Sequence, residues 1–567
     1  MTSHLMNCPE GIPLARPDVE HVLAERGRGG YRQYRIPALA VTTRGTLLAA
    51  YDGRPNLDDL PSPIDLLLRR SVDNGRTWRD QQVVRTGVGL EGYGDPSLLV
   101  DAVTGRIFLF HAAGTRAGFF EAAAGLGTGD DVQHCDLSFS DDDGQTWRHR
   151  RLTAQLKLGG GPELKLGGGP ERGITGIFAA AGQGIQIHAG PFTGRLVQQF
   201  VVLVAGNILA ASAYSDDHGE TWTLGQLIGA EAGAAAPNEN KVVCLSDGRL
   251  LLHSRATPRR LSAISGDGGH TWSALAAVED LPDPGDNGSL ARFDGLPLPA
   301  GHAMAETDTW LLASNNHDPA LRRNTVLSLS RDNGATWPAK LVICPGSSAY
   351  STVARLPDGN IGVLYERQGY RQIVFCSIPA AQVTEAGAPP KDGPGDDGVV
   401  FDMELRSITP GRPAVWRNAG EFHVMAPAAA GDWDVHTWKE IGQGYSPEAA
   451  QVIGTREAQD LNYGPVIPGY KEGDIFAFTG RARNHGSALA AGVRLTGPGA
   501  AGFDAADLQP GEEALYFTPV CTVTAEDIER GFLDIRYAVE WAARGRGRRL
   551  ERRFTVNTSD GTVEART

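Results

Sequence analysis

Cysteine is scarce in this chain, and no two cysteines stand at a spacing that binds metal. The 567 residues include six cysteines and no Cys-x-x-Cys motif, which argues against a zinc site and a disulfide framework. We therefore expect small buried thiols that are mostly reduced. The six positions are Cys8, Cys135, Cys244, Cys344, Cys376 and Cys521.

Long apolar runs are also missing. The nearest to one, residues 196–214, is interrupted by Gln198, Gln199 and Asn207. A membrane-spanning helix needs about twenty apolar residues, so we predict no membrane span. The stretch instead predicts two strands joined by a turn.

Positive charge is in deficit: 53 Lys and Arg stand against 67 Asp and Glu, a net charge of −14. This sign disfavours nucleic acid or an anionic membrane surface as the main partner. It leaves open a small anionic ligand, because a local cluster of arginines can attract an anion whatever the net charge of the chain.

The first nine residues lack the basic and apolar regions of a signal peptide. We expect a cytoplasmic protein, or a secreted or cell-surface protein whose leader was removed.

Helical periodicity is weak, and short alternating strands dominate residues 31–378. Asp-Gly and Asn-Gly turns separate strand patterns such as 45–51, 105–111 and 247–253. Residues 379–398 are rich in Pro, Gly, Ala and Asp, which is the composition of a linker.

Beyond the linker, the alternation at 474–483 and 531–540 predicts a β-sandwich of immunoglobulin-like size. The basic stretch 544–553 is interpreted as a solvated hairpin tip in preference to a polyanion site. We therefore predict an all-β chain with domains at 1–378 and 399–567, joined by residues 379–398.

Residues 156–163 and 164–171 are identical copies of Leu-Lys-Leu-Gly-Gly-Gly-Pro-Glu. The repeat is rich in glycine but lacks the Lys-Ser or Lys-Thr ending of a phosphate-binding loop. We expect a surface loop that arose by duplication.

The pattern Ser-x-Asp-x-Gly-x-Thr-Trp occurs five times, at 71–78, 140–147, 215–222, 265–272 and 330–337. The successive spacings of 69, 75, 50 and 65 residues match the length of a small four-stranded sheet with variable loops. A repeat of this period indicates a radial or stacked architecture.

The octapeptide itself has a physical interpretation as a hairpin turn. Its Ser and Asp side chains can cap a tight turn through hydrogen bonds to the backbone, and its Gly supplies a positive φ. We expect Thr and Trp to begin the next strand, with the indole wedged against the neighbouring sheet. A calcium loop at 140–144 is the competing interpretation, and it fails because no Glu follows at the required ligand position.

One further motif makes a family resemblance specific. Residues 34–39, Tyr-Arg-Ile-Pro-Ala-Leu, resemble the Arg-Ile-Pro motif that opens the catalytic domain of bacterial exo-sialidases (neuraminidases), and the octapeptides resemble the Asp-boxes of that family. The resemblance covers about residues 20–378, and the carboxy-terminal part shows none of it. It implies a six-bladed β-propeller as catalytic domain over residues 1–378.

Sialosides carry a carboxylate on the anomeric carbon, and planar guanidiniums bind a carboxylate bidentately. The resemblance implies a clamp of three arginines, assigned here to Arg35, Arg255 and Arg322. Arg323 is the rival for the third place. Arg54 is a further candidate at the substrate rim, with a solvated loop residue as the equally weighted alternative.

The same carboxylate would repel a carboxylate nucleophile at short range, and sialidases use tyrosine instead. A phenol has a pKa near 10 and needs a base partner. The resemblance assigns the nucleophile to Tyr350 and its base to Glu239, which follows Asn238 where relatives often carry an acid. Tyr365 is the competing tyrosine. Its neighbour Glu366 fits the glutamate that orients the first arginine.

The general acid is expected on a loop soon after the Arg-Ile-Pro strand. The family's acid falls twenty-four residues after the first arginine, which is Asp59. Asp58 is the runner-up, and Asp52 is interpreted as a turn residue. The acid protonates the departing oxygen and then activates water, so retention of configuration is expected. This scheme requires no metal and no other cofactor.

Three functions remain open on the sequence. The first is a monomeric exo-α-sialidase acting on sialylated glycoproteins, glycolipids or oligosaccharides. The second is a trans-sialidase or a hydrolase specific for deaminated sialic acid. The third is a propeller that binds glycans without catalysis, against which stands the presence of a residue for every catalytic role. For the carboxy-terminal domain, two roles stay open: it binds carbohydrate, or it is a structural spacer.

Overall fold

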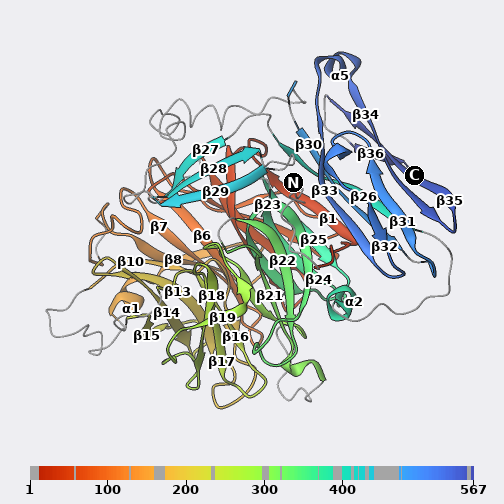
Figure 1. Cartoon of the computed structure of the whole chain (residues 1–567). Coiled ribbons are helices and arrows are strands. Elements are labelled where there is room, and N and C mark those ends of the chain that lie inside the picture. The colour runs from red at the N-terminus through yellow and green to blue at the C-terminus, as the bar shows by residue number, and fades with distance from the viewer. Residues whose placement is uncertain are drawn as a thin grey trace.

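The structure is a computed structural model built almost entirely from antiparallel sheets (Figure 1). It describes residues 12–566 except 56–58, 127–128, 159–172, 231–235, 296–305, 320–321, 368–369, 387–398, 410–413, 419–420, 428–432, 440–471, 474, 485 and 559–562. Most of the tandem repeat, Cys8 and Asp58 therefore lie outside the described residues. Among the described residues, no helix combines the length and the apolar character needed to cross a membrane.

The first part of the chain forms a six-bladed β-propeller, as predicted. The first blade contains β2 (Gln33–Val41), β3 (Leu47–Arg54), β4 (Asp65–Ser71) and β5 (Gln82–Arg85). The second contains β6 (Gly92–Val100), β7 (Ile107–Gly114), β8 (His134–Ser140) and β9 (Arg148–Arg151), and β11 (Gly182–Gln183) runs parallel to β6. The third contains β10 (Ile174–Ala179), β13 (Leu196–Val204), β14 (Asn207–Ser215) and β15 (Thr223–Ile228), with β12 (Ile185–Gln186) paired to β13. The predicted strand-turn-strand at 196–214 is thus confirmed as β13 and β14.

Of the remaining three blades, the fourth is a separate sheet, whereas the fifth and sixth share one long strand. The fourth contains β16 (Asn240–Cys244), β17 (Leu250–Ser254), β18 (Arg259–Ser265) and β19 (Ala276–Pro282). The fifth contains β20 (Ser289–Arg292), β21 (Leu311–Asn316), β22 (Arg323–Ser330) and the first half of β23 (Ala339–Arg355). The second half of β23 continues into the sixth blade with β24 (Ile361–Arg367), β25 (Gln372–Ile378) and β1 (Val19–Glu25). Because β1 is the outer strand of the last blade, the two ends of the propeller close the ring.

The five octapeptides form the turn between the third and fourth strands of their blades. In the first copy the Gly75 amide donates to Ser71 Oγ at 2.9 Å, the Thr77 amide donates to Asp73 Oδ1 at 2.9 Å, and Gly75 has φ +83°. The predicted capping is therefore confirmed. Thr and Trp, however, stay in the turn, and β5 begins only at Gln82. The hydrogen bonds to the Asp side chain hold this part of the chain out of the ladder.

Three of the octapeptide tryptophans make ring contacts with the preceding blade, as expected. Trp78 meets the ring of Phe375 edge-on with centroids 5.1 Å apart, and Trp222 meets Phe110 at 4.9 Å. Trp337 lies against His253 of the fourth blade at 5.5 Å. The motif therefore both closes a hairpin and joins neighbouring blades.

The predicted linker begins as ordered structure. Residues Ala380–Glu385 form α2, and Val383 is fully buried in the same apolar cluster as Val374 and Ile378 of β25. Composition alone indicated a linker, but the apolar Val383 packs α2 onto the propeller. Within the described ranges, the other short helical segments are α1 (Thr153–Leu158), α5 (Ala525–Arg530), η1 (Glu306–Thr309) and η2 (Ala500–Gly502).

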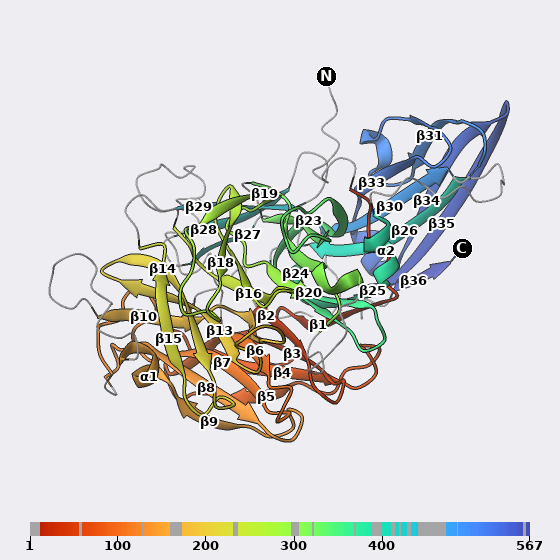
Figure 2. The same ribbon diagram turned by 90° about the horizontal axis from the view of Figure 1, so that it is seen from below.

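The carboxy-terminal part contains a β-sandwich, drawn mainly in blue beside the propeller in Figure 2. One sheet contains β26 (Val399–Thr409), β30 (Ile475–Asn484) and β33 (Glu513–Thr522). The other contains β32 (Ala506–Leu508), β31 (Ala490–Thr496), β34 (Phe532–Ala543), β35 (Arg546–Asn557) and β36 (Val563–Arg566). Phe401 and Phe478 of the first sheet pack with Tyr537 and Phe554 of the second.

Two details differ from the predictions for this part. Strands β27 (Ala414–Asn418), β28 (Glu421–Pro427) and β29 (Trp433–Lys439) pair with one another in a separate three-stranded sheet. The basic stretch is a turn only at Arg544 and Gly545, which have φ +49° and +74°, and its remainder lies in β35. Arginines such as Arg549 and Arg553 extend this strand by pairing with Glu540 and Asp534.

The cysteines within the described residues carry free thiols. Cys135, Cys244, Cys344 and Cys376 are buried and Cys521 is partly buried. Their placement agrees with the expectation of small buried residues.

Candidate active site

The structure brings five of the predicted residues together at the centre of the propeller, although they come from different blades. Arg35 lies in β2, Glu239 precedes β16, Arg255 follows β17, Arg322 precedes β22 and Tyr350 lies in β23. Tyr350 stands where β23 passes from the fifth blade to the sixth, beside an irregularity in the pairing with β24. From this position Tyr350 contacts Glu239 and Arg255 through its hydroxyl, and Arg35 and Arg322 lie beside its ring.

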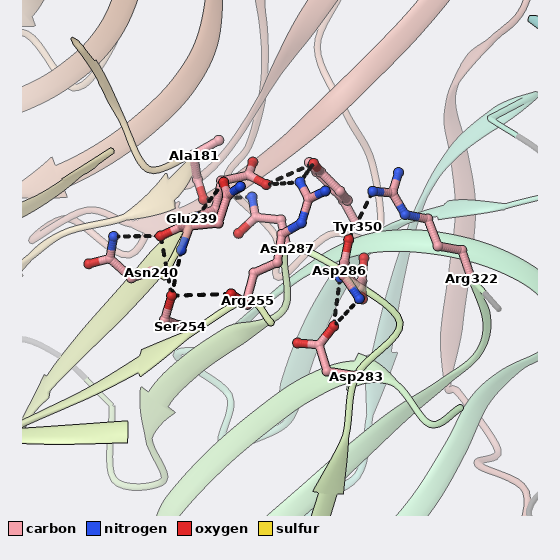
Figure 3. A network of polar contacts seen from close by, with 12 residues as sticks. Ala181, Glu239, Asn240, Ser254, Arg255, Asp283, Asp286, Asn287, Arg322 and Tyr350 are labelled. Carbon is pink, nitrogen blue, oxygen red and sulfur yellow. Dashed lines mark hydrogen bonds and ion pairs between the residues drawn. The ribbon is translucent and has the colours of Figure 1, made fainter. Parts of the chain in front are cut away.

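Tyr350, Glu239 and Arg255 form a closed hydrogen-bonded group (Figure 3). The Tyr350 hydroxyl donates to Glu239 Oε2 at 2.8 Å and accepts from Arg255 Nη1 at 2.8 Å. Arg255 Nη1 also donates to Glu239 Oε2 at 2.7 Å. This arrangement gives a phenol both a proton acceptor and a cation to stabilise its oxyanion.

Burial raises the pKa of Tyr350 well above its ordinary value. Arg255, Arg322 and Arg35 oppose that rise, whereas Glu239 adds to it. The phenol is therefore protonated at neutral pH in the resting site. For it to act as a nucleophile, its proton must pass to Glu239 as the new bond forms.

Glu366 holds both the first arginine and the backbone of the tyrosine. Arg35 Nε donates to Glu366 Oε1 at 3.1 Å and Arg35 Nη2 donates to Oε2 at 3.4 Å. The amides of Ile36 and Tyr350 donate to the same carboxylate at 2.8 and 3.1 Å. A single buried carboxylate thus fixes Arg35 relative to Tyr350, and the Arg35 guanidinium carbon lies 4.8 Å from the Tyr350 ring centroid.

Arg322, predicted as the third arginine, lies with its guanidinium carbon 5.3 Å from the Tyr350 ring centroid. Arg322 Nη2 donates to the Gly285 carbonyl at 2.8 Å, and Nη1 donates to the Tyr370 hydroxyl at 2.6 Å. The rival, Arg323, pairs with Asp318 at 2.7 Å. Figure 3 shows Arg322 on the side of Tyr350 opposite Arg255.

The predicted acid, Asp59, is bound to Arg54 at the edge of this group. Arg54 Nη1 donates to Asp59 Oδ1 at 2.6 Å, and Arg54 Nη2 donates to Asp52 Oδ2 at 2.7 Å. The Asp59 side chain is 37% exposed, whereas Arg54 and Asp52 are buried. The interpretation of Arg54 as a solvated loop residue is therefore wrong, and its contact with substrate stays a prediction.

Asp52 is not a turn residue, because it lies within β3 and is fully buried. Burial raises the pKa of Asp52 to about 6, which Asp59 favours and Arg54 opposes. The sequence suggested a turn since Gly53 follows, but Asp52 instead pairs with Leu66 in the ladder between β3 and β4.

Asp95 in β6 lies beside these acidic groups and was missed by the sequence analysis. Desolvation raises its pKa well above the ordinary range, and Asp52 and Asp59 add to the rise. Asp95 has φ +61° and precedes Pro96, just as Ile36 has φ +61° and precedes Pro37. The first two blades thus share an inner-strand irregularity at this point, and strained residues of this kind cluster at functional sites. The Gly-Asp-Pro sequence was the available signal.

A polar group beneath the tyrosine was also missed. Lys241 is buried and its Nζ donates to Asn287 Oδ1 at 2.5 Å, while the Asn287 carbonyl accepts from the Ser351 amide at 3.3 Å. Burial lowers the pKa of Lys241 to about 7; Glu239 and Asp286 oppose this effect, and Arg260 reinforces it. No local sequence pattern marks a lysine in an apolar strand as part of a site.

The loop after β19 joins this group to the third arginine (Figure 3). Asp283 Oδ2 accepts from Arg260 Nη1 at 3.0 Å, and both side chains are fully buried. Burial raises the pKa of Asp286 to about 7; Asp283 adds to the rise and Arg322 opposes it. Among the described residues, no group of three or more His, Cys, Asp and Glu side chains is placed to hold a metal ion.

Comparison with known proteins matches residues 43–363 to the BNR repeat-like domain family. A sialidase of Micromonospora viridifaciens is 45% identical over 367 residues, which are 63% of this chain and 53% of that protein. A sialidase of Bacteroides fragilis is 29% identical over 59% of this chain and 60% of its own length.

The solved structure of the Hadza microbial sialidase Hz136 superimposes with a TM-score of 0.54 at 25% identity, covering 64% of this chain and 69% of that one. The chain spans little more than half the length of the Micromonospora protein and three fifths of the Bacteroides protein.

Proposed function

The chain belongs to the BNR repeat-like domain family and is a relative of the bacterial sialidases, and from this membership we propose that it is a retaining exo-α-sialidase. The substrate would be a glycoprotein, glycolipid or oligosaccharide that ends in sialic acid. The observation that carries the proposal is the hydrogen-bonded group of Tyr350, Glu239 and Arg255, with two further guanidiniums beside the tyrosine ring.

Substrate binding in this proposal depends on charge. Arg35, Arg255 and Arg322 bind the carboxylate of the sialoside, because guanidinium forks match carboxylate geometry. The bound carboxylate places the anomeric carbon over the Tyr350 hydroxyl. A neutral nucleophile suits this position since an aspartate or glutamate would be repelled by the substrate's own charge.

The first chemical step transfers the sialyl group to the enzyme. The Tyr350 oxygen attacks the anomeric carbon while Glu239 takes the phenol proton, and Asp59 donates a proton to the departing glycosidic oxygen. Arg255 stabilises the charge that develops on the phenol oxygen. Asp59 then removes a proton from water, which attacks the same carbon, and Glu239 returns the proton to Tyr350. Two inversions give net retention.

The test is hydrolysis of a fluorogenic aryl α-sialoside by the wild-type chain and by Tyr350→Phe. We expect release by the wild type and a loss of turnover by orders of magnitude in the variant, because phenylalanine has no nucleophilic oxygen. Tyr365→Phe is the matched control, since Tyr365 is an equally buried tyrosine one strand away.

The outcomes separate the competing functions. Wild-type rates in Tyr350→Phe would remove Tyr350 from the nucleophile role. No release by a well-folded wild type, combined with binding of sialylated oligosaccharide, would favour a glycan-binding propeller. Product analysis with a lactose acceptor present distinguishes hydrolysis from transfer.

A further inference from the structure

A second buried tyrosine, Tyr370, lies against the arginine clamp. It stands at the turn between β24 and β25 and is 1% exposed. Its backbone has φ +62°, a left-handed conformation that a bulky residue adopts only when its surroundings hold it there. The Gln33 side-chain amide donates to the Tyr370 carbonyl, and Gln33 is itself buried in β2 two residues before Arg35. The strand of the first arginine thus holds this turn.

The ring of Tyr370 lies against the first arginine. The Arg35 guanidinium carbon is 4.2 Å from the Tyr370 ring centroid and 4.8 Å from the Tyr350 ring centroid. Aromatic rings attract a guanidinium through the negative charge of their faces. Arg35 is therefore positioned by two rings and by the Glu366 carboxylate at its edge.

The hydroxyl of Tyr370 binds a different arginine. It accepts a hydrogen bond from Arg322 Nη1 at 2.6 Å, while the Gly285 carbonyl accepts from Arg322 Nη2 at 2.8 Å. One side chain therefore contacts two of the three guanidiniums, the first through its ring and the second through its oxygen.

We propose that Tyr370 is a positioning residue that sets the spacing between Arg35 and Arg322 for a substrate carboxylate. The inference rests on the proposed sialidase function and deepens it. Two guanidiniums repel each other, and something must hold them close before the substrate arrives. The phenol of Tyr370 holds Arg35 against the face of its ring and Arg322 through its neutral hydroxyl oxygen. An acid in its place would compete with the substrate carboxylate for the same donors.

The experiment compares Tyr370→Phe with Tyr365→Phe. The first change removes only the oxygen that binds Arg322 and keeps the ring over Arg35. The second removes the hydroxyl of a tyrosine that is equally buried in the same blade. Thermal unfolding of each variant reports any general loss of structure.

Two readouts separate positioning from packing. With the fluorogenic aryl α-sialoside, we expect Tyr370→Phe to raise KM about tenfold with a small change in kcat. The reason is that the variant loses the hydrogen bond that positions the Arg322 guanidinium, and Arg322 binds the carboxylate of the substrate before the reaction begins. Calorimetric binding then compares the 2,3-unsaturated analogue of sialic acid with its carboxamide. The variant should lose about tenfold in affinity for the carboxylate and much less for the carboxamide, while Tyr365→Phe behaves as wild type.

The inference is overturned if KM and the carboxylate preference of Tyr370→Phe equal those of the wild type. It is also overturned if both ligands lose affinity equally, because that pattern indicates a distorted site. Failure of the proposed function looks different, since the wild type itself would then neither hydrolyse the sialoside nor prefer the carboxylate ligand.

Discussion

Asp52 and Asp59 share one cation, Arg54, but their surroundings differ. Asp52 is fully buried in β3, whereas the Asp59 side chain is 37% exposed on the segment that follows. An acid that protonates a leaving group must reach the substrate and exchange protons with water. Of the two, only Asp59 has that access, which supports it as the acid and leaves Asp52 as the group that holds Arg54.

At the residue scale, we predict that Asp59→Ala depends on the leaving group. The variant should lose about 10²- to 10⁴-fold in kcat/KM on sialyl-lactose, because an alkoxide leaving group needs a proton. An aryl sialoside with an acidic phenol should lose far less. Equal losses on both substrates would point to Asp58 as the acid or to a structural defect.

Lys241 carries a second prediction at this scale, about stability and pH. The unfolded lysine keeps a pKa near 10.4, while burial lowers the folded value to about 7. Between pH 7 and 10 the unfolded chain holds the extra proton, so wild-type stability gains from rising pH by up to about 1.4 kcal/mol per unit. Lys241→Met lacks this dependence.

Urea unfolding at pH 6, 8 and 9.5 checks this. The stability of Lys241→Met relative to wild type should be greatest at pH 6 and should fall as pH rises. A difference that is constant across this range would mean that Lys241 stays charged in the folded protein, held by Glu239 and Asp286.

At the scale of the element, the octapeptide turn does two things at once. Its side chains satisfy the backbone of the hairpin, and its glycine lets the preceding blade approach. A Cβ on Gly219 would stand 2.4 Å from the Phe108 ring of the second blade, and Gly219 also has φ +81°. The motif therefore needs glycine for space as well as for conformation.

Gly219→Ala tests which requirement dominates. Gly206→Ala is the matched control, because Gly206 has φ +79° and would meet nothing within 4 Å. We expect the control to lower the free energy of unfolding by about 1 kcal/mol through strain alone, and Gly219→Ala to lower it by about 3 kcal/mol since a clash adds to strain. Equal losses in chemical denaturation would show that the close approach relaxes without cost.

At the scale of the whole molecule, the propeller depends on closure by β1. Leu23 is 4% exposed and packs with Ile373 and Phe375 of β25, whereas Val22 on the same strand is 44% exposed. The sixth blade also contains β24, which carries Glu366, and the second half of β23, which carries Tyr350. The closing strand and these two residues therefore belong to one continuous sheet.

Leu23→Ala should lower the free energy of unfolding by about 2–4 kcal/mol through loss of buried volume. Val22→Ala should change it by less than about 0.5 kcal/mol, because its side chain is largely in water. Guanidinium unfolding measures both. Equal changes in the free energy of unfolding for the two variants would mean that β1 joins the propeller through its hydrogen bonds, with little contribution from side-chain packing.

The sequence by itself determined what depends on neighbouring residues or on a repeated pattern. The octapeptide turns follow from hydrogen bonds that span four residues, such as Gly75 to Ser71, so each copy predicts its own geometry. Five copies predicted a radial or stacked architecture, and the family resemblance carried by these copies and the Arg-Ile-Pro motif implied the six-bladed propeller and the candidate residues of the site.

Only the tertiary structure decided which side chains meet across blades. Arg35 and Glu366 are 331 residues apart, Tyr350 and Glu239 are 111 apart, and Arg322 reaches Tyr370 across the fifth and sixth blades. Lys241 and Tyr370 carry no local signal that marks them, and the Gly-Asp-Pro sequence at Asp95 does not show which side chains it will meet. Their roles arise from burial beside charges supplied by distant strands, and a chain's local pattern does not encode which distant strands will become neighbours.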